Sequence, residues 1–152
     1  MLPVCASRYP LWVPELLIAT DSAQVYQEVR SAVDEPGTNL RWARSGAAVV
    51  PALQERGADL VVADLQLGSM GGYAIAMEIA LEAGAARLQP TPVLLLLDRR
   101  ADVFLAKRTG VAGWLLKPLD PLRTADAVKS ILAGGTYQDA SYEAVPADVL
   151  PA

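Results

Sequence analysis

The chain has 152 residues, of which 53% are hydrophobic and 20% charged, with a formal net charge of -4, a single cysteine and no histidine. This length fits one domain with an ordinary core, and Cys5 alone cannot build an internal disulfide or a thiolate metal site. The lack of histidine excludes histidine-based triads, imidazole zinc ligands and a phosphohistidine on this chain. Any chemistry must therefore use carboxylates, lysine or hydroxyl groups.

Charge and hydropathy also narrow the range of partners. The 13 lysines and arginines form no dense run, so we expect no nucleic-acid binding. The longest apolar stretch, Val93 to Leu97, is far shorter than the roughly 18–20 residues that cross a bilayer, so we expect no membrane partner. The first residues lack a basic segment followed by an apolar one, which predicts no signal peptide and a cytoplasmic location.

Short apolar runs alternate along the chain with longer stretches of helical period, a pattern typical of a parallel sheet with crossover helices. The predicted strands cover 16–20, 40–43, 60–63, 93–97 and 113–116. The helices expected after them run from the N-cap Ser22 to Pro36, over 47–56, 73–83 and 101–109, and from Pro121 to about Ala133. Five strand–helix units therefore make an α/β fold.

The two ends of the chain have a different composition. Residues 1–15 contain three prolines and are expected to be irregular, and residues 16–134 form the predicted domain. Residues 135–152 carry Asp139, Glu143 and Asp148 with no basic residue, which predicts a flexible acidic tail.

Three charged residues stand directly after predicted strands. Asp21 follows the first strand, Asp64 the third and Lys117 the fifth. The carboxyl ends of parallel strands meet at one edge of a sheet, where ligands usually bind. Two neighbouring carboxylates need a cation such as Mg²⁺, and a nearby lysine supplies the positive charge that a phosphoryl group requires. The pattern predicts a phosphoryl-accepting site without histidine.

These motifs resemble the receiver domain of two-component response regulators. Residues 59–72 (DLVVADLQLGSMGG) are similar to the family's phosphoacceptor strand and loop, with Asp64 as the acceptor. Residues 110–118 (GVAGWLLKP) resemble its Lys-Pro turn, with Lys117 in place and Trp114 at the switch aromatic. Asp21 is similar to the second residue of the family's acidic pair. The resemblance covers residues 16 to about 133.

The resemblance implies a flavodoxin-like, or CheY-like, doubly wound five-stranded parallel sheet of order 2-1-3-4-5 with five helices. It implies a single-domain response regulator, a phosphoprotein of a two-component phosphorelay. Asp64 would accept a phosphoryl group from a sensor histidine kinase or phosphotransfer protein, and Lys117 would pair with that group. Asp21, Asp64 and the backbone carbonyl of Gln66 would hold Mg²⁺. Signalling would pass to a downstream protein partner, and a homodimer is left open.

Three positions depart from the family's pattern. Thr20 replaces the first acidic residue, so we expect weak Mg²⁺ binding. Leu97 replaces the serine or threonine that ends the fourth strand, and so offers no hydroxyl. Asp98 replaces a small residue, where a carboxylate would either repel a phosphoryl group or serve as a cation ligand. These departures support an alternative, a pseudo-receiver that binds proteins independently of phosphorylation.

Each candidate residue also has a plainer interpretation. Asp21 could cap the first helix, Asp64 could be a turn residue, Lys117 a solvated strand end and Trp114 a packing residue. The fold also hosts flavin-binding and hydrolytic enzymes, but no glycine-rich loop follows the first strand, so we do not expect an enzyme.

Overall fold

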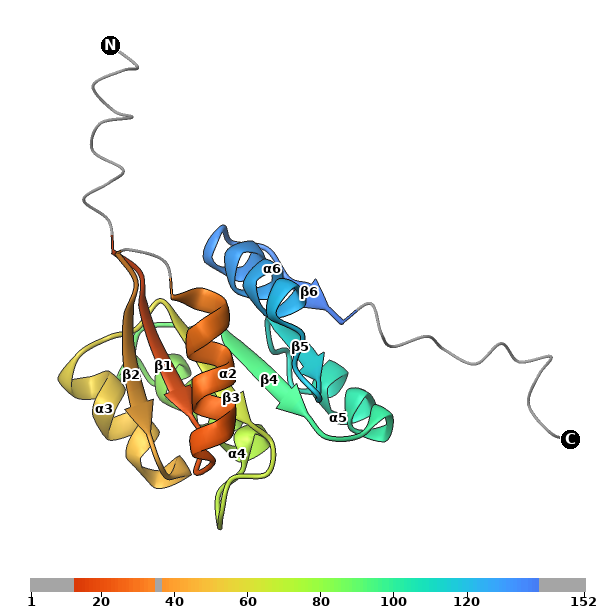
Figure 1. The fold of residues 1–152 in the computed structure, drawn as a ribbon. Coiled ribbons are helices and arrows are strands. Elements are labelled where there is room, and N and C mark those ends of the chain that lie inside the picture. Colours follow the sequence, from red (N-terminus) through yellow and green to blue (C-terminus); the bar gives the residue numbers. More distant parts are fainter. Residues whose placement is uncertain (1–12, 35–36, 140–152) are drawn as a thin grey trace, which may run out of the picture.

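The computed structural model describes residues 13–34 and 37–139 and folds them into a parallel sheet with helices on both faces (Figure 1). The strands are β1 (Glu15–Ala19), β2 (Asn39–Ala43), β3 (Leu60–Asp64), β4 (Val93–Leu97), β5 (Gly113–Leu116) and β6 (Tyr137–Gln138). They lie in the order β2-β1-β3-β4-β5-β6, and all neighbours run parallel. The predicted order 2-1-3-4-5 is confirmed, with one further strand beyond β5.

The helices follow the strands as predicted. They are α2 (Ala23–Val33), α3 (Val49–Glu55), α4 (Gly72–Gly84), α5 (Val103–Arg108) and α6 (Pro121–Leu132). Ser22 caps α2 by accepting a hydrogen bond from the Val25 amide. Short 3₁₀ turns, Gly46–Ala48 and Arg100–Asp102, precede α3 and α5. The sequence pattern did not separate these turns from the helices, because a three-residue 3₁₀ turn is too short to show a period of its own.

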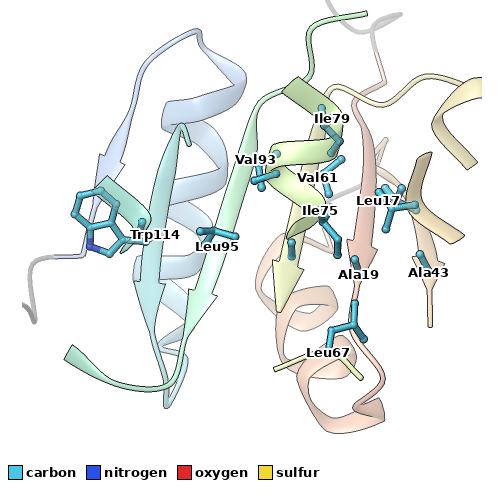
Figure 2. Packing of buried hydrophobic residues seen from close by; sticks show 14 of the residues in the cluster. Leu17, Ala19, Ala43, Val61, Leu67, Ile75, Ile79, Val93, Leu95 and Trp114 are labelled. Carbon is cyan, nitrogen blue, oxygen red and sulfur yellow. The ribbon is translucent and has the colours of Figure 1, made fainter. Parts of the chain in front are cut away.

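Alternate residues of the strands point to opposite faces, and each face has its own core. On one face, Leu17, Val61 and Leu95 pack against α3, α4 and α5 (Figure 2). On the other face, Leu16, Val62 and other strand residues pack against α2 and α6. Both faces of the central strands are buried, which explains their unbroken apolar sequences. Because helices cover both faces, the polar residues that follow the strands gather at the carboxyl edge of the sheet.

A sixth strand occupies part of the expected acidic tail. Tyr137 and Gln138 pair with Gly113 and Trp114 of β5, and the next residue, Asp139, is 3% exposed. A two-residue strand has too little hydrophobic pattern to stand out in a sequence. The structure therefore extends the folded part of the chain to residue 139.

The remaining ends, residues 1–12 with Cys5 and residues 140–152 with Glu143 and Asp148, lie outside the described residues. The expected irregular N-terminal segment and flexible acidic tail fall largely on these residues and stay predictions. Among the described residues, no helix combines the length and the apolar character needed to cross a bilayer.

Candidate functional site

Four polar residues lie at the carboxyl edge of the sheet. Thr20 follows β1, Asp64 is the last residue of β3, Asp98 follows β4 and Lys117 follows β5. Strands β1, β3, β4 and β5 are consecutive neighbours in the parallel sheet, so their ends meet there. The structure brings these side chains together in one connected network.

Asp64 is at the centre of this network. Its side chain is 2% exposed, and its Oδ1 accepts hydrogen bonds from Lys117 Nζ at 2.6 Å and from the Gln66 amide at 3.2 Å. Its Oδ2 accepts from Thr20 Oγ1 at 2.9 Å. A buried carboxylate is stable only when it is paired and hydrogen-bonded, and here both oxygens are. These bonds therefore hold the Asp64 carboxylate in one orientation, so Asp64 is not an ordinary turn residue.

Lys117 bridges two carboxylates. Besides Asp64, its ammonium contacts Asp98 Oδ1 at 3.2 Å, and its side chain is 20% exposed. Burial alone would lower the pKa of Lys117, but the hydrogen bond and charge of Asp64, and then those of Asp98, outweigh it and raise this pKa. Lys117 is thus a fixed cation, not a solvated strand end. The peptide bond between Lys117 and Pro118 is cis.

Thr20 is a hydrogen-bond donor to Asp64, a role that sequence reasoning missed. Its side chain is fully buried, and its hydroxyl also accepts a hydrogen bond from the Ser22 amide at 3.1 Å. Its amide donates to the Ala43 carbonyl at 3.1 Å, and its own carbonyl accepts from Trp42 Nε1 at 2.7 Å. All of its polar groups are therefore used. Its hydroxyl orients the Asp64 carboxylate without adding a negative charge.

Asp21 follows Thr20 and is exposed at the same edge. It is not the cap of α2, because Ser22 has that role. No three carboxylate, histidine or cysteine side chains gather into a metal-binding group in the part of the chain that the structure describes. Mg²⁺ is commonly held by only one or two carboxylates and several waters. Asp21, Asp64 and the Gln66 carbonyl offer oxygen donors of the kind that Mg²⁺ takes, and their role as its ligands stays a prediction.

Leu97 and Trp114 are core residues in the structure. Leu97 is fully buried, and no hydroxyl ends β4. Trp114 is 4% exposed and lies at the β5 end of the core shown in Figure 2. Its indole Nε1 is buried without a hydrogen-bond partner among the described residues. These contacts support the packing interpretation of Trp114, and its switch role stays a prediction.

Comparison with known proteins agrees with this architecture. A sequence model of the response regulator receiver domain matches residues 16–129, about three quarters of the chain. The chain belongs to the response regulator receiver family. The receiver is 22% identical to Protein PilH of Pseudomonas aeruginosa over 119 residues, which cover 78% of this chain and 98% of PilH.

Solved structures show the same fold. The signal receiver domain of a histidine kinase from Syntrophus aciditrophicus is 28% identical, with a TM-score of 0.69 over 80% of this chain and 92% of that one. A two-component response regulator of the LuxR family from Aurantimonas has a TM-score of 0.70 at 24% identity, over 82% of this chain and 89% of its own. The flavodoxin-like fold of the receiver is thereby confirmed.

Proposed function

We propose that this receiver is a response regulator that accepts a phosphoryl group on Asp64 and signals through contacts with a downstream protein. Receivers work with histidine kinases or phosphotransfer proteins, and such a partner would supply the phosphohistidine. The observation that carries the proposal is the buried Asp64 carboxylate paired with Lys117 at 2.6 Å. The match to nearly all of PilH supports a single-domain arrangement, for which we propose a cytoplasmic location.

The transfer needs a carboxylate nucleophile and a fixed positive charge. An oxygen of Asp64 forms a bond to phosphorus, and the bond between phosphorus and the donor's imidazole nitrogen breaks. The electron pair stays on the imidazole, which takes up a proton. Lys117 would pair with the added phosphoryl oxygens, and its contact with the Asp64 carboxylate supports this role.

Receivers generally bind Mg²⁺ at their acidic pocket, and we assign its ligands here to Asp21, Asp64 and the Gln66 carbonyl. When bound, the ion would supply positive charge that offsets the repulsion between Asp64 and the phosphoryl group. Thr20 contributes a hydroxyl where a carboxylate would add a metal ligand. We therefore expect phosphorylation to need a high Mg²⁺ concentration.

A chemical phosphoryl donor tests the proposal directly. The full chain is incubated with acetyl phosphate or phosphoramidate and Mg²⁺ and then weighed by mass spectrometry. The expected result is a gain of one phosphoryl group that Asp64→Asn abolishes. Asp126→Asn, at an exposed position on α6, is the matched control and should retain the gain. A wild-type chain that gains no mass even from a cognate kinase would refute the proposal.

A specific observation favours the second candidate, a phosphorylation-independent binding module. Lys117 is shared between Asp64 and Asp98, and this second carboxylate opposes an incoming phosphoryl group. The buried Leu97 also leaves that group without a hydroxyl partner. This candidate predicts that Asp64→Asn leaves partner binding unchanged. Loss of binding in that variant would exclude it.

A further inference from the structure

The loop that carries Lys117 is held at both ends by one buried carboxylate. Asp139 Oδ2 accepts a hydrogen bond from the Leu116 amide at 2.7 Å, directly before Lys117. Asp139 Oδ1 pairs at 2.9 Å with Arg123 Nη1, on the first turn of α6. The Asp139 side chain is 1% exposed. A buried carboxylate with two charge-assisted or backbone partners is a strong local restraint.

The pairing of strand β6 with β5 places the Asp139 carboxylate beside the end of β5. The Tyr137 amide donates to the Ala112 carbonyl at 3.0 Å, and Tyr137 pairs in register with Gly113. A Cβ atom on Gly113 would lie 2.5 Å from the Tyr137 carbonyl oxygen, so a larger residue there would push β6 away. Strand β6 thus lies beside β5 at one edge of the sheet, and Asp139 follows it directly (Figure 1).

The two sides of the β5 backbone have separate partners at this point. The Lys117 amide donates to the Leu97 carbonyl of β4 at 2.8 Å, while the preceding amide of Leu116 points to the opposite side, toward Asp139. The β5 end is therefore fixed from both sides just where the Lys117 side chain turns toward Asp64. The family match covers residues 16–129, so Asp139 lies beyond the matched segment.

We propose that Asp139 is a positioning residue for Lys117, and that β6 thereby forms part of the support of the phosphoryl-accepting site. This inference rests on the proposed function for the role of Lys117, but the contacts that carry it are independent of phosphorylation. Without Asp139, Leu116 loses its acceptor and Arg123 loses its buried partner, so the loop between them gains freedom. Lys117 then spends more time away from Asp64.

Amine labelling measures this effect without phosphoryl transfer. The chain has three lysines, Lys107, Lys117 and Lys129, and brief treatment of the full chain with acetic anhydride followed by peptide mass spectrometry gives a rate for each. In Asp139→Ala we expect Lys117 to be labelled about tenfold faster, with the other two lysines unchanged. Asp126→Ala removes an exposed carboxylate from α6 and should leave all three rates unchanged.

Milder variants keep the test decisive if Asp139→Ala does not fold. Asp139→Asn retains an oxygen acceptor for Leu116 but loses the charge that pairs with Arg123, so we expect an intermediate rate at Lys117. Arg123→Gln should have a similar effect from the other side. A wild-type rate at Lys117 in these folded variants would overturn the proposal. Equal gains at all three lysines would also overturn it, because they would report a general loss of stability.

Phosphoryl transfer provides a second readout that separates the two proposals. If the wild-type chain is phosphorylated, Asp139→Ala should slow the gain of mass, and the same substitution should add nothing in a Lys117→Ala background. Full additivity would show that Asp139 does not act through Lys117. If the wild-type chain is never phosphorylated, the proposed function fails, while the labelling rates still decide whether Asp139 positions Lys117.

Discussion

The hydrogen bond from Thr20 to Asp64 should contribute measurably to stability. Thr20→Val replaces the hydroxyl with a methyl group of similar size at a fully buried position. The substitution removes the 2.9 Å bond to Asp64 Oδ2 and the 3.1 Å bond from the Ser22 amide. Core packing is nearly unchanged, so the effect reports the polar interactions.

The size of the effect follows from these two bonds. A hydrogen bond to a charged group contributes about 1.5–3 kcal/mol, and a neutral one about 0.5–1.5 kcal/mol. Ser22 is only half-buried, so water can replace part of its lost bond. We expect the free energy of unfolding to fall by about 2–4 kcal/mol. With a urea m-value of roughly 2 kcal/mol/M, the midpoint should fall by about 1–2 M.

Urea denaturation followed by circular dichroism measures this change. Thr20→Ser keeps the hydroxyl and is the matched control, with an expected loss of about 1 kcal/mol. In an Asp64→Ala background, Thr20→Val should cost less by about 1.5–3 kcal/mol, because the bond to Asp64 is already absent. If Thr20→Val and Thr20→Ser are equally stable, or if the double-mutant cycle gives no coupling, the reasoning is refuted.

Three further predictions concern β6 and the core. Gly113→Ala should speed hydrogen exchange of the Tyr137 amide about tenfold or more by displacing β6, whereas Gly57→Ala, with open space around it, should not. Burial, and then the charge of Asp139, raise the pKa of Tyr137 in the folded protein. The contribution of Tyr137 to stability is therefore complete below about pH 10, and it is lost as the pH rises through this folded-state pKa. Unfolding measured from pH 9 to 11.5 should therefore depend less on pH in Tyr137→Phe, and an identical profile would contradict this. Ile75→Ala, at a fully buried position on α4, should cost about 2–5 kcal/mol in urea denaturation, and a loss below 1 kcal/mol would contradict the packing described.

Local patterns were sufficient to predict most of the fold. The apolar runs that became β3 and β4 are buried on both faces, and a fully buried parallel strand must be apolar throughout. Asp64 and Lys117 were found because a charged residue ending such a run is conspicuous, and parallel strands place those ends at one edge. These inferences depend only on neighbours within a few residues and on the topology that they imply.

Which polar side chains contact one another at this edge could not be predicted from local patterns. The pairing of Lys117 with both Asp64 and Asp98, and the hydroxyl of Thr20 on Asp64, join residues 19 to 53 positions apart. No local pattern specifies which of several polar side chains at one sheet edge will touch. Thr20 was interpreted as a lost carboxylate, but in the structure it is a buried donor.

Asp139 is the clearest case of a contact that local sequence patterns do not predict. In the sequence it is one of several acids in a segment without basic residues, which is the composition of a solvated tail. Its burial depends on Arg123 and on the edge of β5 that pairs with β6, and folding brings both of them to Asp139. Chain composition and hydrophobic period thus determine the elements and the sheet edge that carries the chemistry. Three-dimensional packing alone selects the charged partners there, because those contacts join residues distant in sequence.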